Sequence, residues 1–406
     1  MERRLRAVDA APTDDDMVVA ILDVSRAHFH PMIKRKVHIE LPEEDKIVGQ
    51  DMVGELLRTM YGTRDAAASW EEFYTEVLEA AGAKSGDFSP CLFHSVQTNL
   101  RIWVHGDDKA LVGKRSVVMA MIKVLEGKMM IKTKAMLGFA RGDDRSATLL
   151  NRIIELKVIG GKPTLCFEPD PRHAQIAIRD LGLDGEKTKG LSAPGANDET
   201  FEDATLIEER SGQLRFRSVA MRLSFLGQDS PHLQQPVKEA SRLMQVPTVG
   251  ALNRLKRIGR YLVEHPRCVQ HFVLQPRVEE VVVKSDSDHA GCKRTRKSTS
   301  CALLMHGLHL LLCSSTTQKI EGLSSCESEF LALVKAGSIG MGAKAMAKDF
   351  GMDLKLKLET DSSGAKGVAA RRGVGRIRHL HTPLLWLQRR VADRTLRSCR
   401  HNYSKY

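Results

Sequence analysis

The chain has 406 residues, of which 42% are hydrophobic and 28% are charged, so it is too long for one ordinary domain. This hydrophobic fraction is sufficient for packed cores and excludes a globally disordered chain. The net charge is +12, and residues 371–406 alone contain ten Lys or Arg and one acid, which suggests a polyanionic partner. No apolar run approaches a membrane span and no signal peptide is visible, so a soluble intracellular protein without a membrane partner is expected. The eight cysteines form no C-x-x-C pair, which argues against a zinc site.

The first half of the sequence alternates short apolar runs with helical patterns. Residues 17–24 (MVVAILDV) predict a buried strand, and residues 64–82 have helical periodicity that stops at a glycine. The segments 101–105 and 109–112 predict a hairpin around a Gly-Asp-Asp turn. Residues 115–127 are predicted to be helical.

The second half changes character at about residue 276. Residues 140–210 show no clear periodicity, whereas 215–265 are predicted to be mostly helical. From residue 278 onward the patterns predict three strands, a helix, a strand and two further helices. The last strand shows alternating Leu and charged residues at 354–359, and Pro383 suits the first turn of the last helix.

Acidic side chains stand at the end of predicted strands in the first half. Asp23 ends the strand 17–24, and Asp107 and Asp108 lie at the tip of the predicted hairpin. Two-metal phosphoryl transfer needs such carboxylates, because hard cations such as Mg²⁺ or Mn²⁺ prefer oxygen ligands. A second Gly-Asp-Asp at 142–144 lacks flanking apolar strands and is interpreted as a loop.

A second set of acids, Asp286, Glu327 and Asp361, stands at strand ends or the start of a helix in the second half. Each helical residue advances by about 100°, so Glu327 and Glu329 should project in different directions. We predict that Glu327 points with the buried stripe and that Glu329 faces solvent. Asp288 is a second choice for the strand position. The alternative interpretation is that these residues are helix caps and surface acids.

Several segments carry a resemblance to the Pol polyprotein of copia-type long-terminal-repeat retrotransposons, over roughly residues 20–395. They occur in the order of that family and include LDVSRAHFH, LLRTMYGTRDAAASWEEFYTEVLEAAG, WVHGDDKALVG, VVVKSDSDHAGCKRTRKSTS, SSTTQKIEGLSSCESEFLAL and LETDSSGA. Single motifs of this kind are weak, but their common order makes the resemblance specific.

The resemblance implies an α+β chain with a partial right-hand polymerase palm and a helical connection, followed by an α/β RNase H-like domain. The expected bounds are 17–210 for the truncated palm and the region after it, 211–275 for the helical thumb or connection, 277–395 for the RNase H-like domain and 396–406 for a basic tail. The implied polymerase metal ligands are Asp23, Asp107 and Asp108. The implied nuclease metal ligands are Asp286, Glu327 and Asp361, with Mg²⁺ or Mn²⁺ as the cofactor.

The sequence also departs from the family pattern. The family's fingers should precede Asp23, where only 22 residues stand, so a partner subunit or a longer precursor would have to supply them. His28 stands where the family has a bulky aromatic residue, and Asp65 where it has a glutamine. An acid at Asp65 would repel a triphosphate if it lined that pocket. His381 replaces a fourth nuclease acid. These departures predict an impaired polymerase half.

The expected function is that of an RNA-directed DNA polymerase with a ribonuclease H domain. Its partners would be RNA, DNA and RNA–DNA hybrid, with dNTP as a substrate if the polymerase is active. The alternative is a non-catalytic nucleic-acid-binding remnant of a decayed element, whose basic tail binds backbone phosphates. A DDE-type integrase ranks third, because the helix-borne acid lies between the aspartates in the sequence.

Overall fold

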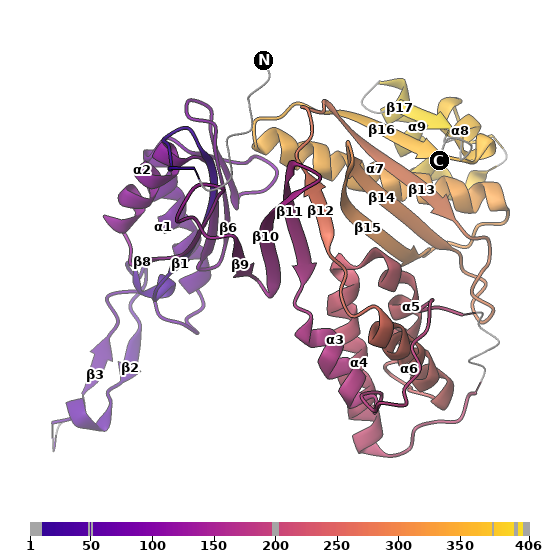
Figure 1. The fold of residues 1–406 in the computed structure, drawn as a ribbon, viewed down its shortest axis with the longest axis horizontal. Coiled ribbons are helices and arrows are strands. Elements are labelled where there is room, and N and C mark those ends of the chain that lie inside the picture. The colour runs from indigo at the N-terminus through magenta and orange to yellow at the C-terminus, as the bar shows by residue number, and fades with distance from the viewer. Residues whose placement is uncertain are drawn as a thin grey trace. The chain divides into compact units, whose positions relative to one another are not determined.

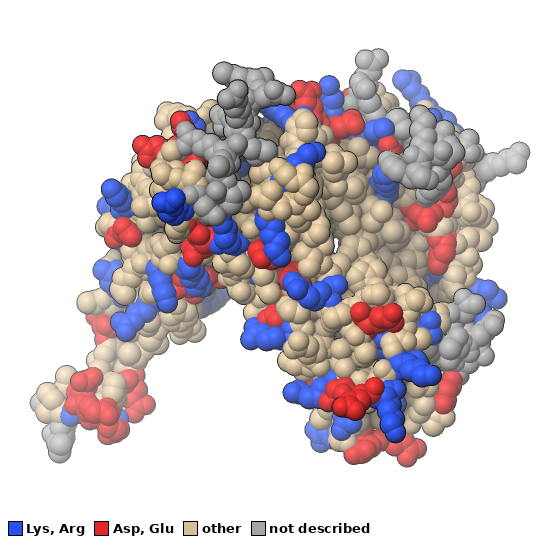
Figure 2. Space-filling view, viewed as in Figure 1, with Lys and Arg blue, Asp and Glu red and all other residues tan. Residues whose placement is uncertain are grey.

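The computed structural model describes two compact units. The first comprises Met1–Leu149 with Met346–Met352, and the second comprises Leu150–Ala345 with Asp353–Tyr406. The described residues are 10–47, 49, 52–196, 203–375, 377–393 and the backbone of 397–400. On the face shown in Figure 2, Lys and Arg side chains are interspersed with Asp and Glu side chains over the described residues.

The first unit is built on a six-stranded sheet with the order β4-β5-β6-β7-β1-β8. Its strand β1 (Met17–Val24) is the predicted buried strand and lies antiparallel between β7 and β8. Ala20 and Leu22 are fully buried in the core that this sheet shares with its helices, and Ile21, on the other face of the strand, is also fully buried. The other strands are β4 (Lys84–Ser85), β5 (Leu92–Ser95), β6 (Leu100–His105), β7 (Asp108–Lys114) and β8 (Ile131–Leu137).

Helices α1 (Ala66–Ala80) and α2 (Arg115–Glu126) contribute to the core of this sheet, and both were predicted from the sequence. In α1 the buried residues Trp70, Tyr74 and Leu78 recur every four positions, which places them on one face of the helix. A separate hairpin stands away from the sheet in Figure 1. It comprises β2 (His38–Glu40) and β3 (Val53–Glu55). The short helices η1 (Ala27–Phe29) and η2 (Glu43–Asp45) lie near it in the sequence. Strand β9 (Ser146–Leu149) is the last element of the segment Met1–Leu149.

The second unit begins with antiparallel strands and a helical cluster. Strand β11 (Lys162–Pro169) pairs with both β10 (Arg152–Ile159) and β12 (Gln270–Val273). The segment 215–265 is mostly helical, as predicted, and its helices share one apolar core with α3 (Arg172–Asp180). They are α4 (Arg210–Asp229), α5 (Pro231–Ser241) and α6 (Val249–Glu264). The sequence showed no clear periodicity over 140–210, where the structure has β9, β10, β11 and α3.

A five-stranded sheet of order β15-β14-β13-β16-β17 follows. Its central strand β13 (Glu280–Ser287) is antiparallel to β14 and parallel to β16 (Lys355–Thr360). Strands β14 (Thr299–His306) and β15 (His309–Thr317) are two of the three strands predicted after residue 278, and they pair antiparallel. Strand β17 (Arg397–Arg400), in the segment expected to be a basic tail, pairs in parallel with β16.

Helix α7 (Ser325–Asp349) packs closely against this sheet. A Cβ atom at Gly340 would lie 2.5 Å from Leu356 Cδ1 and 2.9 Å from Val283 Cγ2, so the glycine permits the close approach. By length and composition α7 is the one helix in the described part of the chain that is suited to span a membrane. Its fully buried Phe330 and Leu333 are what a core helix requires. The remaining helices are α8 (Ser363–Ala370), η4 (Arg378–Leu380) and α9 (His381–Ala392), so the predicted order of elements is confirmed.

Candidate functional site

Three carboxylates converge at one edge of the five-stranded sheet. Ligand oxygens of Asp286, Glu329 and Asp361 all lie within 4.8 Å of one another, and no other such group of three occurs among the described residues. Because β13 and β16 are parallel and Ser285 pairs with Thr360, Asp286 and Asp361 leave neighbouring strand ends side by side. The first turns of α7 bring Glu329 to the same edge.

Glu329 is the buried member of this acidic cluster. Its side chain is 8% exposed, and its Oε1 accepts a hydrogen bond from the Ser287 amide at 3.2 Å, whereas the buried Oε2 has no hydrogen-bond partner. Burial raises the pKa of Glu329 to about 7, and the charges of Asp286 and Asp361 add to the effect. A buried, unpaired carboxylate oxygen beside two further carboxylates is a donor set that fits a hard divalent cation. The residues present therefore fit the metal that the sequence resemblance implies.

The expectation that Glu329 faces solvent is wrong, because Glu329 is buried. Glu327 is also buried, as predicted, but its carboxylate has other partners than the two aspartates. The Glu327 carboxylate accepts a hydrogen bond from the Leu323 amide at 2.7 Å and forms an ion pair with His379 at 3.3 Å. The Ser324 hydroxyl in turn accepts a hydrogen bond from the Glu327 amide at 3.3 Å. This reciprocal arrangement is a capping box at the start of α7. Glu327 therefore stabilises the helix end and does not join the two aspartates.

The error lay in the choice of the buried face. The two glutamates do diverge along the helix, but the buried stripe continues through Leu333, Ala336 and Gly340, while Ser338 is exposed. The Ser-x-x-Glu pattern at 324–327 was the sequence signal for a cap. Gly340 marks the face that approaches the sheet, and Gly337 lies against Trp386 and Leu387 of α9.

A buried polar network holds the Glu329 turn against β13. Ser328 is fully buried, and its hydroxyl lies 3.0 Å from the Ser298 hydroxyl and 3.2 Å from Nδ1 of His289. Gln318 Nε2 donates to the Ser328 carbonyl at 2.8 Å and to the Ser287 hydroxyl at 3.0 Å. Such second-layer contacts orient metal ligands.

Asp288, the second choice for the strand position, has a different role. It accepts a hydrogen bond from the Thr299 amide. Its carboxylate therefore binds the backbone at the start of β14, next to the end of β13.

The three acids of the first unit are arranged differently. Asp23 pairs with Asp108 in the register of β1 and β7, and the Lys134 ammonium lies 2.8 Å from Asp23 Oδ1 and 2.9 Å from Asp108 Oδ1. Asp107 is exposed in the hairpin turn, where its carbonyl accepts a hydrogen bond from the Val24 amide at 3.0 Å. A protein cation thus bridges two of the three predicted ligands, and this set does not fit an open metal site.

A second lysine, which the sequence reasoning missed, lies beneath these acids. Lys109 is fully buried, and its ammonium lies 4.8 Å from the ring centre of Trp70 and 5.5 Å from that of Tyr74. Its Nζ has no hydrogen-bond partner. Burial lowers the pKa of Lys109 to about 8, although Asp107, Asp108 and Asp23 oppose the change. The available signal was a lysine at a strand position where the alternating pattern calls for an apolar residue.

The residues that depart from the family pattern have identifiable neighbours. Asp65 Oδ1 lies 3.2 Å from the Arg35 guanidinium, so its charge is paired. The His28 ring packs edge-on against Tyr61, with 4.6 Å between the ring centres. The side chain of His381 lies outside the described residues.

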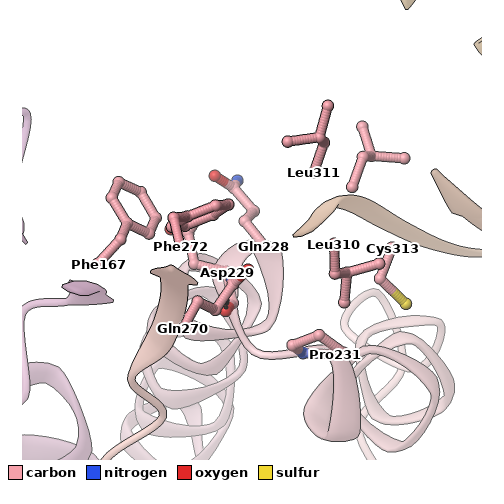
Figure 3. Close-up of a pocket in the computed structure, with 10 residues that line it drawn as sticks. Phe167, Gln228, Asp229, Pro231, Gln270, Phe272, Leu310, Leu311 and Cys313 are labelled. Carbon is pink, nitrogen blue, oxygen red and sulfur yellow. Dashed lines mark hydrogen bonds between the residues drawn. The ribbon is translucent and has the colours of Figure 1, made fainter. Parts of the chain in front are cut away.

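A pocket in the second unit lies apart from the predicted site residues. Figure 3 shows Phe167 and Phe272 on one side, Leu310 and Cys313 on the other, and Asp229 among the polar residues. Its volume is about 190 Å³, and none of the six predicted site residues lines it. Arg152 holds Asp229 in an ion pair at 2.9 Å, so this carboxylate is not free for a ligand.

The fold is similar to part of a viral protease–reverse transcriptase. The foamy viral protease–reverse transcriptase, solved in complex with RNA/DNA hybrid, superposes with a TM-score of 0.54 and 11% identity over 98% of this chain and 45% of the viral chain. The predicted α+β fold class is therefore confirmed. No family model matches the chain.

Curated relatives are retrovirus-related Pol polyproteins of plant transposons. The polyprotein from transposon TNT 1-94 of Nicotiana tabacum is 20% identical over 97% of this chain, and that from RE2 of Arabidopsis thaliana is 23% identical over 82%. The Pol polyprotein from RE1 of Arabidopsis thaliana is 31% identical over 30% of the chain and 8% of that polyprotein. The chain spans 29% and 22% of the first two polyproteins. The predicted resemblance to retrotransposon Pol polyproteins is confirmed.

Proposed function

We propose that the second unit is a metal-dependent nuclease that hydrolyses the RNA strand of an RNA–DNA hybrid. The observation that carries this proposal is the cluster of Asp286, Glu329 and Asp361, in which a buried Glu329 oxygen has no partner. The Pol polyproteins that the chain resembles and the viral enzyme solved with RNA/DNA hybrid support this choice of substrate.

In this mechanism the three carboxylates would hold Mg²⁺ or Mn²⁺. Such an ion would supply Lewis acidity and activate a water for hydrolysis of the phosphodiester. Before it binds, Glu329 holds a proton up to a pH of about 7, which relieves repulsion from Asp286 and Asp361. Asp286 is exposed and Glu329 is buried, so the open side of the cluster faces solvent and can receive a backbone phosphate. The network around Ser328 keeps Glu329 directed at this edge.

The proposed partners are RNA, DNA and RNA–DNA hybrid, bound through phosphate contacts of the basic chain. DNA synthesis from dNTP is proposed to be impaired, because Lys134 bridges two of the predicted palm ligands. A partner subunit or longer precursor is proposed to supply the fingers. The competing function is that of a non-catalytic nucleic-acid-binding remnant of a decayed element.

The test is cleavage of labelled RNA in an RNA–DNA hybrid by the purified full chain with Mg²⁺ or Mn²⁺. Glu329→Gln and Asp286→Asn should each abolish cleavage, while Glu327→Gln is the matched control on the same helix and should retain it. Activity that survives Asp286→Asn would mean a different site or a contaminant. Absence of cleavage with either metal, together with retained salt-sensitive binding of the hybrid, would favour the non-catalytic alternative.

A further inference from the structure

We propose that the positive charges of Lys134 and Lys109 replace the divalent ions that two-metal phosphoryl transfer would require. They do so at the three acids of the first unit, Asp23, Asp107 and Asp108. The first unit then maintains these acids as a lysine-paired cluster and binds no divalent ion there. This inference concerns the first unit alone and does not depend on the nuclease proposed for the second. The sequence predicted these acids to be metal ligands, but two of them contact a lysine ammonium.

The position of Lys134 follows from an irregularity in the sheet. In the pairing of β1 with β8, Ala135 lies opposite Ile21 and Thr133 lies opposite Leu22, so Lys134 is the extra residue of a bulge. A bulge redirects the side chain of the extra residue. Here the ammonium lies between one oxygen of Asp23 and one of Asp108, at 2.8 and 2.9 Å. One oxygen of each carboxylate is thus paired with a protein cation.

Lys109 adds a second positive charge from inside the unit. It follows Asp108 in β7 and pairs with Leu22 of β1, so it faces the helix-covered core beneath the acids. Its ammonium lies over the rings of Trp70 and Tyr74 and cannot reach solvent, because the side chain is fully buried. A buried cation has little solvent around it, so its repulsion of a nearby divalent ion is weakly screened.

The charge balance distinguishes this cluster from the one in the second unit. Three carboxylates and two ammonium groups carry a net charge of about −1 at neutral pH. The cluster of Asp286, Glu329 and Asp361 has no lysine or arginine among the ion partners in the described part of the chain. Only the second cluster therefore has uncompensated negative charge sufficient to attract a divalent ion.

The first experiment measures Mn²⁺ binding to the full chain by electron paramagnetic resonance. The background variant Asp286→Asn with Asp361→Asn removes the second cluster, and it should leave no bound Mn²⁺. Adding Lys134→Ala, alone or with Lys109→Met, should create a Mn²⁺ site that Asp23→Asn then removes. Mn²⁺ bound by the background variant and lost with Asp23→Asn would overturn the inference. Failure of both lysine variants to gain a site would also overturn it, because the lysines would not be what excludes the ion.

A second experiment measures, in EDTA, whether Asp23→Asn raises or lowers the melting temperature of the first unit. If lysines pair the acids, Asp23→Asn should lower the melting temperature of the first unit, because Lys134 loses a partner. If the acids were an open metal site, the same change should raise it by relieving repulsion among carboxylates. Lys114→Ala breaks a more exposed ion pair with Asp15 and is the control, which should change neither the melting temperature nor Mn²⁺ binding. Should Lys109→Met fail to fold, Lys134→Ala suffices, since Lys134 is partly exposed.

Discussion

Replacing Glu329 with Gln should remove a pH dependence of stability that the acidic cluster imposes on the second unit. The pKa of Glu329 is raised from 4.5 to about 7 by burial and by the charges of Asp286 and Asp361. The folded chain therefore binds this proton more tightly than the unfolded chain does. Between pH 4.5 and 7 the native state carries more protons, so the unfolding free energy falls as the pH rises through this window.

The size of the effect follows from the two pKa values. A change from 4.5 to about 7 corresponds to roughly 3 kcal/mol, at about 1.36 kcal/mol for each pKa unit. This stabilisation is present below pH 4.5 relative to neutral pH and is lost above about 7 when no metal is bound. A divalent ion that binds the folded cluster should restore stability at neutral pH by mass action. Glu329→Gln keeps the shape of the side chain and removes both effects.

The assay is urea unfolding of protein labelled with 5-fluorotryptophan, followed by ¹⁹F NMR in EDTA or Mg²⁺ from pH 4.5 to 8. The chain has three tryptophans, and Trp386 on α9 packs against Gly337 of α7, so its signal reports on the second unit. The quantity of interest is the difference between wild type and Glu329→Gln at each pH, which cancels the other titrating groups. If the two proteins lose stability in parallel between pH 4.5 and 7, the reasoning about Glu329 is refuted.

Three further changes have defined outcomes. Glu327→Ala should lower the unfolding free energy of the second unit by about 1 kcal/mol through loss of the capping box, and a stability loss accompanied by loss of cleavage would contradict its assignment as a cap. Gly340→Ala should lower the unfolding free energy of the second unit by about 1–3 kcal/mol, because the new methyl group would collide with Leu356, and this outweighs the helix preference of alanine. The control is Gly367→Ala in α8, where an added Cβ atom would have no neighbour within 4 Å. It should be neutral or stabilising in the same denaturation assay. Ser328→Ala should reduce kcat of hybrid cleavage by about 10–100-fold by loosening the network behind Glu329, and unchanged kcat with unchanged metal affinity would show that this network does not position the ligand.

From residue 278 to α9, the sequence by itself determined the order of the elements and the positions of two of the three clustered carboxylates. Period-two alternation and the turn residues were sufficient to place strands that end near Asp286 and Asp361. Once a strand–helix–strand order predicts parallel neighbours, two acids at the same ends of those strands must lie together. The resemblance to Pol polyproteins rested on the order of short motifs along the chain, which is also a one-dimensional property.

Only the tertiary structure decided which residues complete each cluster. The face of α7 that is buried depends on where Gly340 meets Leu356 and Val283, which helical periodicity alone cannot specify. Glu329 is therefore brought to the aspartates, and Glu327 to the helix cap. In the first unit, the bulge in β8 directs Lys134 to Asp23, and a bulge depends on how neighbouring strands align. Contacts of this kind join residues far apart in the chain, so local sequence pattern does not encode them.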